Sequence, residues 1–77
     1  MKKTEPEQIT IRKEPIRLSQ FLKLANVVQD GLEAKIRILE EEVRVNGEIE
    51  TRRGRKLYDQ DTIQLEDALF QVQVQTP

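Results

Sequence analysis

The apolar positions near the start of the chain change their spacing between residues 9 and 25. Ile9 and Ile11 alternate with polar residues, which is typical of a short strand, and Pro15 ends that strand because proline cannot donate to a sheet ladder. From residue 18 the apolar residues follow a helical spacing: Leu18, Phe21, Leu22 and Ala25. The pattern predicts an edge strand followed by a short helix.

A second helix is predicted from Gly31 to Glu41. Asp30 stands directly before it and belongs to the residue types that cap helix N-termini. The apolar residues of this helix fall on two stripes, one of Leu32, Ile36 and Leu39 and the other of Ala34 and Ile38. The pattern alone leaves open which stripe is buried.

Charged residues mark the end of this second helix. Arg37 lies four residues from both Glu33 and Glu41, and each such pair stabilises a helix by about 0.2–0.5 kcal/mol. The run Glu40–Glu42 falls where the helix dipole disfavours negative charge, so it should help to end the helix. We expect a structural role for Arg37 and no ligand role for the three acids.

A hairpin is predicted after the second helix. Residues 43–45 alternate between valine and arginine, and Asn46-Gly47 is a strong turn signal. A two-residue turn would pair Val45 with Glu48. A connection with a bulge would instead pair Val45 with Ile49 and keep the apolar side chains on one face, so we favour the bulge.

The last third of the chain carries two more strand patterns. Leu57, Ile63 and Leu65 surround a polar turn at residues 59–61, and Phe70, Val72 and Val74 alternate with glutamines. The glutamine-rich strand could form a sheet edge open to self-association, or it could be an ordinary half-buried strand. Altogether we expect one α+β domain over residues 9–75, preceded by a flexible tail of residues 1–8.

Length and composition narrow the function classes. A chain of 77 residues forms one small domain, which buries only about 60% of the surface that it exposes when unfolded. It has no cysteine and no histidine, so disulfides, the usual zinc ligands, thiol nucleophiles and the commonest general base are all missing. The acids gather at a helix end and in turns instead of forming a pair in a cleft. We therefore expect no enzymatic activity, no cofactor and no metal.

Hydropathy bears on location. No apolar run approaches the roughly 18 residues of a membrane-spanning helix, and the first eight residues lack the hydrophobic block of a signal peptide. We expect a cytoplasmic protein without a membrane partner, and a monomer.

Positive charge is concentrated in one short segment, although the whole chain has 14 acids and 13 bases. Four cations surround Gly54 within five residues, namely Arg52, Arg53, Arg55 and Lys56. Such a cluster suits a nucleic-acid backbone, and glycine allows a close approach of the chain to a phosphate. The alternative is a solvated turn whose cations pair with nearby acids, such as Glu48, Glu50, Asp59 and Asp61.

The order of the motifs is similar to that of a known family. Arg17-Leu18 opens the first helix, Glu33-Ala34-Lys35 lies in the second, and residues 43–47 read VRVNG, followed by Asp61-Thr62-Ile63 after a turn. Over residues 16–66 this order resembles the S-four RNA-binding domain, or alpha-L motif, in its compact stand-alone bacterial form. The resemblance implies two helices packed on a small bent, mostly antiparallel sheet of four to five strands.

The resemblance also implies a function, which is the binding of structured RNA such as rRNA or a tRNA-like fold, with ribosome association as one setting. It places Arg17, Lys35, Arg44, Asn46 and Gly47 on the RNA-facing motif of the family. The basic loop extends this surface, so the predicted RNA-binding residues also include Lys23, Arg52, Arg53, Arg55 and Lys56.

Recognition of RNA shape through phosphates and 2′-hydroxyls is expected, because Tyr58 is the single aromatic candidate for base stacking. If about five cations each neutralise a phosphate, a plot of the logarithm of affinity against the logarithm of salt concentration should have a slope near −3.5 to −4.5. Charge reversal at Arg52 and Arg55 should abolish binding and either leave stability within about 1 kcal/mol or raise it, because a surface cluster of cations repels itself. The competing hypothesis is a protein-interaction module that docks an acidic partner through the same loop or the C-terminal strand.

Overall fold

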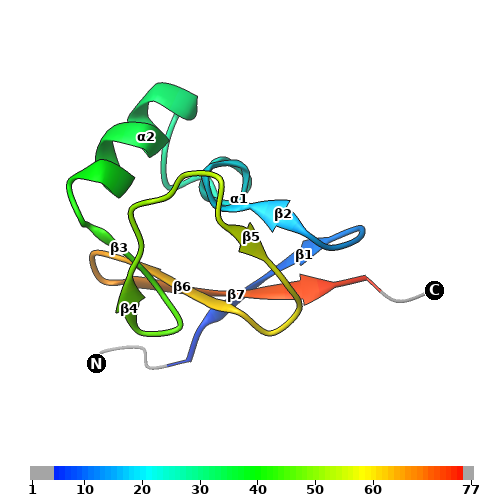
Figure 1. The fold of residues 1–77 in the computed structure, drawn as a ribbon. Coiled ribbons are helices and arrows are strands. Elements are labelled where there is room, and N and C mark those ends of the chain that lie inside the picture. Colours follow the sequence, from blue (N-terminus) through cyan, green and yellow to red (C-terminus); the bar gives the residue numbers. More distant parts are fainter. Residues whose placement is uncertain (1–4, 76–77) are drawn as a thin grey trace.

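Two helices and two sheets make up the fold of the chain, seen in a computed structural model that describes residues 5–75 (Figure 1). The helices are α1 (Leu18–Leu24) and α2 (Gly31–Leu39). The strands are β1 (Glu7–Ile11), β2 (Ile16–Arg17), β3 (Val43–Val45), β4 (Glu48–Ile49), β5 (Lys56–Leu57), β6 (Thr62–Leu65) and β7 (Ala68–Val74). The predicted α+β fold class is confirmed.

The main sheet has the strand order β1-β7-β6-β3-β4. Its strands pair antiparallel except β1 and β7, which run parallel from Glu7 opposite Phe70 to Ile11 opposite Val74. The predicted edge position of the first strand is confirmed. The glutamine-rich strand β7 lies inside the sheet, so of the two alternatives the ordinary half-buried strand is confirmed and the sheet edge is excluded. Its backbone is bonded on both sides because Phe70 and Val72 anchor it in the core.

The expected N-terminal tail overlaps this sheet. β1 begins at Glu7, so residues 7 and 8 pair with β7. Residues 1–4 of the expected tail lie outside the described residues.

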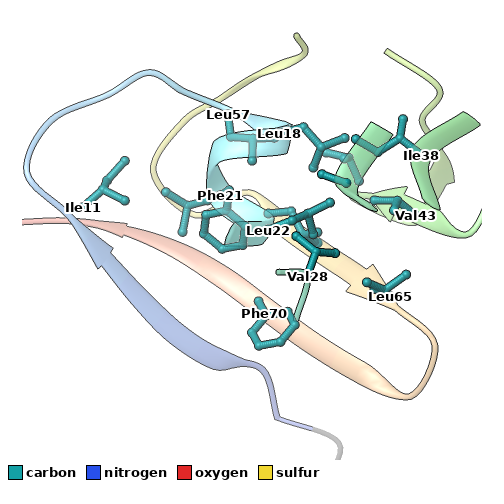
Figure 2. Close-up of a cluster of buried hydrophobic side chains, with 14 residues drawn as sticks. Ile11, Leu18, Phe21, Leu22, Val28, Ile38, Val43, Leu57, Leu65 and Phe70 are labelled. Atoms are coloured by element: carbon teal, nitrogen blue, oxygen red, sulfur yellow. The ribbon is translucent and has the colours of Figure 1, made fainter. Parts of the chain in front are cut away.

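The hydrophobic core is a single layer between the helices and the main sheet (Figure 2). Three residues of the predicted α1 stripe, Leu18, Phe21 and Leu22, are fully buried. The ring of Phe21 meets that of Phe70 edge-on, with centroids 6.4 Å apart at an interplanar angle of 76°. This contact fixes α1 on β7, since edge-to-face aromatic pairs add stability beyond the area they bury.

Helix α2 buries one of its two apolar stripes. Asp30 caps its N-terminus as predicted, because its carboxylate accepts a hydrogen bond from the backbone N–H of Glu33 at 2.9 Å. Ala34 and Ile38 are fully buried, whereas the other stripe, Leu32, Ile36 and Leu39, is exposed. The helix ends at Leu39, two residues before the predicted end, and Glu41 adopts a left-handed φ of 63°.

Arg37 has a structural role, but its partners differ from those predicted. Its Nη2 donates to Glu66 at 2.8 Å, and its Nε lies 3.1 Å from Glu42 in an ion pair without hydrogen-bond geometry. The expected partner Glu33 instead accepts from the backbone N–H of Gln29 at 2.7 Å, and the helix has ended before Glu41. Arg37 therefore joins α2 to the turn between β6 and β7.

The hairpin between β3 and β4 has a two-residue turn, so the predicted bulge is wrong. Val45 pairs with Glu48, and Arg44 pairs with Ile49, which is 47% exposed. Asn46 and Gly47 both have positive φ, at 53° and 88°, as the turn that matches the twist of a hairpin requires. Turn geometry therefore prevails over the burial of one isoleucine.

Candidate nucleic-acid interface

The basic loop between β4 and β5 is fixed to the start of α1. The backbone N–H groups of Leu18 and Ser19 donate to the carbonyls of Arg55 and Arg53 at 2.8 and 3.1 Å. These bonds satisfy two donors that a helix N-terminus leaves unpaired. β2 also pairs with β5, with Arg17 opposite Lys56, and Figure 1 shows the loop passing across α1. The loop and the N-terminus of α1 thus form one unit.

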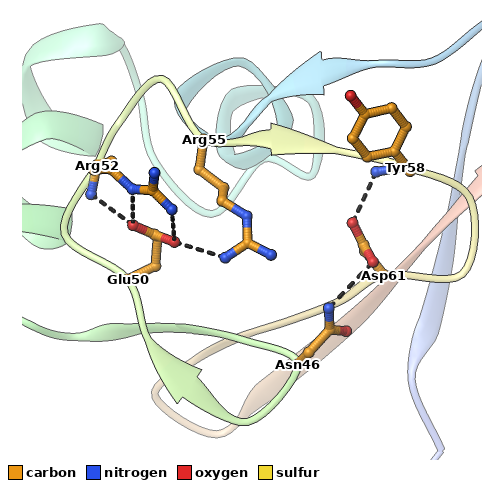
Figure 3. Close-up of polar contacts among 6 residues, drawn as sticks. All are labelled: Asn46, Glu50, Arg52, Arg55, Tyr58 and Asp61. Carbon is orange, nitrogen blue, oxygen red and sulfur yellow. Dashed lines mark hydrogen bonds and ion pairs between the residues drawn. The ribbon is translucent and has the colours of Figure 1, made fainter.

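A buried carboxylate organises this loop from inside (Figure 3). Glu50 is 6% exposed and is the one charged residue buried within residues 5–75. Its oxygens accept bonds from Arg52 through Nε at 2.9 Å, Nη2 at 3.3 Å and the backbone N–H at 3.0 Å. Arg55 Nη1 donates to the same carboxylate at 2.7 Å. Glu50 therefore holds the loop closed by binding both arginines, and we call Glu50, Arg52 and Arg55 the two-arginine clamp.

The clamp shifts the acidity of Glu50. Hydrogen bonds from the Arg52 side chain lower the pKa of Glu50 most, burial opposes them, and Arg55 lowers it further, to about 2 from 4.5. The same contact raises the pKa of the Arg52 guanidinium. The carboxylate is therefore charged at neutral pH and offsets part of the positive charge of the loop.

Two cations of the loop stay unpaired with acids in the described part of the chain. Arg53 and Lys56 have no carboxylate within ion-pair distance there, whereas Arg52 and Arg55 share Glu50. The solvated-turn alternative thus describes one half of the cluster. The loop is also not simply self-repelling, because Arg52 and Arg55 both pair with Glu50. Reversing both charges would leave a buried carboxylate without partners, so the structure leads us to expect a loss of stability instead.

Three basic side chains from distant segments meet at an open depression of about 480 Å³. Arg17 comes from the start of α1, Lys35 from α2 and Arg53 from the loop. The other lining residues are Ser19, Gly31, Leu32 and Gly54. No acid lines the depression, and none of the three cations forms an ion pair within residues 5–75. We call it the cationic depression; its chemistry suits a phosphate group.

The other loop cations lie around a neighbouring hollow. Arg52, Gly54, Arg55 and Lys56 line a second open depression of about 490 Å³. Lys23, in the last turn of α1, stands four residues after Ser19 and so lies on the same side of that helix. The two depressions meet at Gly54, whereas Lys23 lines neither of them.

The VNG turn is held by bonds within the chain. Asn46 Nδ2 donates to Asp61 at 3.1 Å, and its Oδ1 accepts from the backbone N–H of Thr62 at 2.9 Å. Asp61 in turn accepts from the backbone N–H of Tyr58 at 2.8 Å (Figure 3). Arg44 Nη1 donates to the Gly47 carbonyl at 3.3 Å. The geometry thus assigns Asn46 to holding the turn against the 58–61 segment.

Sequence reasoning identified the cations but not their arrangement. The meeting of Arg17, Lys35 and Arg53 depends on how the loop crosses α1, which no local pattern specifies. Glu50 was considered only as one of several pairing acids. Its spacing of two residues before Arg52 and five before Arg55 was the available signal for the clamp.

Comparison with known proteins gives the family to which this chain belongs. The sequence model of the S4 domain matches residues 9–73, and the chain belongs to that family, as the resemblance to the S-four domain implied. One similar protein is the "Probable ribosome maturation protein RlbA" of Bacillus subtilis (strain 168). It is 53% identical over 58 residues, which cover 75% of this chain and 82% of that protein. Within residues 5–75, neither helix has the length and apolar character needed to cross a membrane.

Proposed function

We propose that this protein binds structured RNA without catalysing a reaction, through the surface formed by α1, α2 and the basic loop. The observation that carries the proposal is the convergence of Arg17, Lys35 and Arg53 on one acid-free depression. Clustered cations without partners destabilise a fold by repulsion, and a polyanion relieves that repulsion. The depression is open to solvent, and family membership supports RNA as the polyanion.

The residues divide into two roles in this proposal. Arg17, Lys35 and Arg53 contact phosphates directly, and Lys56 and Lys23 extend the contact along the neighbouring surface. Arg52 and Arg55 contribute from the Glu50 clamp, which leaves 73% of the Arg52 side chain exposed. Asn46, Gly47 and Arg44 act by holding the VNG turn in shape.

The natural ligand we propose is ribosomal RNA, bound in the cytoplasm by a monomer. The name of the Bacillus subtilis relative, which refers to ribosome maturation, supports this choice over tRNA. The protein-docking alternative loses one of its two surfaces, because β7 is not a sheet edge. Its other surface, the basic loop, is the one tested below.

The test is a fluorescence-anisotropy titration with a structured RNA hairpin and its DNA counterpart over a series of salt concentrations. The double variant Lys35→Glu and Arg53→Glu should weaken RNA binding at least 10-fold and reduce the salt slope by about 2, since each phosphate contact contributes about one. Both side chains are exposed, so the fold should persist.

A matched control keeps the net charge change equal. Arg12→Glu with Lys13→Glu reverses two exposed cations in the loop between β1 and β2, outside the cationic depression. It should weaken binding much less than the Lys35 and Arg53 variant. Equal losses in the two double variants would show an effect of net charge alone and refute the site. Absence of RNA binding at low salt would favour the protein-docking module.

A further inference from the structure

A smaller, apolar hollow adjoins the cationic depression. It has a volume of about 210 Å³ and is lined by Lys35, Ile38, Leu39, Thr51 and Arg53. Leu39, in the last turn of α2, gives it an exposed hydrocarbon wall, whereas Ile38 beside it is fully buried. Thr51 adds a methyl and a hydroxyl group. Lys35 and Arg53 line both depressions, so the two share one cationic rim.

The exposure of Leu39 is the second feature of this hollow. Leu39 is 59% exposed although the next residue toward the helix start, Ile38, is fully buried. A single exposed leucine on a protein surface is ordinary. This one stands in a concave site, beside two cations that have no acidic partner in the described part of the chain.

We propose that the apolar hollow accepts one unpaired nucleobase, whose phosphate is held by Lys35 and Arg53 at the shared rim. A nucleotide combines an anion with a flat apolar ring, and the two adjoining sites offer those two chemistries in contact. Thr51 and Arg53 both line the hollow. In this proposal the Thr51 hydroxyl bonds the base edge and the Arg53 guanidinium stacks on the base. The proposal rests on the RNA-binding function and specifies its ligand as a stem with a bulged or looped-out nucleotide.

A fully paired stem would use only half of this surface. In an A-form helix the bases are stacked and their edges lie in grooves, so a base reaches a protein hollow only when it leaves the stack. The duplex backbone could still occupy the cationic depression. Recognition through shape alone, as expected from the sequence, would therefore leave the hollow empty.

The experiment uses three RNA hairpins with one stem sequence: fully paired, with a single-nucleotide bulge, and with an abasic residue at the bulge. Pyrimidine and purine bulges are both included. The full chain should bind the better bulged hairpin about 5-fold more tightly than the paired one, because only the unpaired base can bury apolar surface in the hollow. The abasic hairpin, which keeps the phosphate and the bend, should lose this preference.

Two serine variants on α2 provide the matched comparison. Leu39→Ser removes the hydrocarbon wall and should reduce the bulge preference below 2-fold while leaving affinity for the paired hairpin unchanged. Ile36→Ser alters a similarly exposed residue, 50% exposed, that lines neither depression, and should keep the preference. Circular dichroism would verify that both variants stay folded.

The outcomes separate this inference from the proposed function. Equal binding of bulged, abasic and paired hairpins by the unaltered chain would overturn the nucleobase site while RNA binding itself stands. Retention of the full preference by Leu39→Ser would also overturn it. Failure to bind any of the hairpins would refute both proposals together.

Discussion

Neutralising Glu50 tests whether the two-arginine clamp stabilises the fold. The substitution Glu50→Gln keeps the shape of the side chain but removes its negative charge and replaces one of the two oxygens that accept bonds from Arg52 and Arg55. Each unit by which folding lowers a pKa stabilises the folded chain by about 1.4 kcal/mol. A pKa of Glu50 lowered from 4.5 to about 2 therefore corresponds to about 3 kcal/mol of the free energy of unfolding. The Arg52 side chain is largely exposed and screened by solvent, so we expect Glu50→Gln to lower the free energy of unfolding by about 2 kcal/mol at pH 7.

The stabilisation from Glu50 should depend on pH in a defined direction. The pKa of Glu50 is lower in the folded chain than in the unfolded chain, so its contribution is fully present above about pH 4.5. It is lost as pH falls from 4.5 through about 2. The difference in unfolding free energy between the unaltered chain and Glu50→Gln should therefore shrink toward zero over that interval.

Urea denaturation followed by circular dichroism at several pH values between 2.5 and 7 would measure this difference. Thermal unfolding at pH 7 should show a fall in Tm of about 10 °C for a domain of this size. Glu48→Gln serves as control, because Glu48 lies in the same hairpin but is exposed and has no ion pair within residues 5–75. The reasoning is refuted if Glu50→Gln matches Glu48→Gln in stability, or if its deficit stays constant down to pH 2.5.

Two further predictions concern the same region. Arg52→Glu combined with Arg55→Glu should lower the free energy of unfolding by about 3 kcal/mol, since it surrounds the buried Glu50 with like charge; urea denaturation would measure it, and an unchanged midpoint would contradict the clamp. Asn46→Ala should cost about 1–3 kcal/mol, because alanine disfavours a φ of 53° and leaves Asp61 without the amide donor. Thermal unfolding beside the control Glu48→Ala would detect it, and equal Tm values for the two variants would contradict a structural role for Asn46.

Local patterns in the sequence predicted the elements well. The stripe of Leu18, Phe21 and Leu22 and the cap Asp30 are confirmed, because helix periodicity and capping depend on residues a few positions apart. The VNG turn shows which of two local rules prevails. Asn46 and Gly47 favour a two-residue turn more strongly than the burial of Ile49 favours a bulge, so the predicted bulge is wrong.

Contacts between residues far apart in the sequence could not be predicted from local patterns. Arg37 has acids at helical spacing, yet it pairs with Glu66, which is 29 residues away in the sequence. The two side chains meet because the fold brings α2 close to the turn after β6. In the same manner, Lys35 and Arg53 lie together only because the loop is bonded to the start of α1. Both depend on tertiary packing, and neither has a sequence signal of its own.

The pairing of the first strand with the last has a consequence for synthesis of the chain. β7 supplies the hydrogen-bond partners of both β1 and β6, so neither ladder can form before residues 68–74 have been made. A nascent chain can form its helices and the β3–β4 hairpin early, but β1 must wait with its edge unpaired. Completion of the main sheet therefore waits for β7, and during synthesis the parallel β1–β7 ladder closes only after the intervening residues 12–67 have been made.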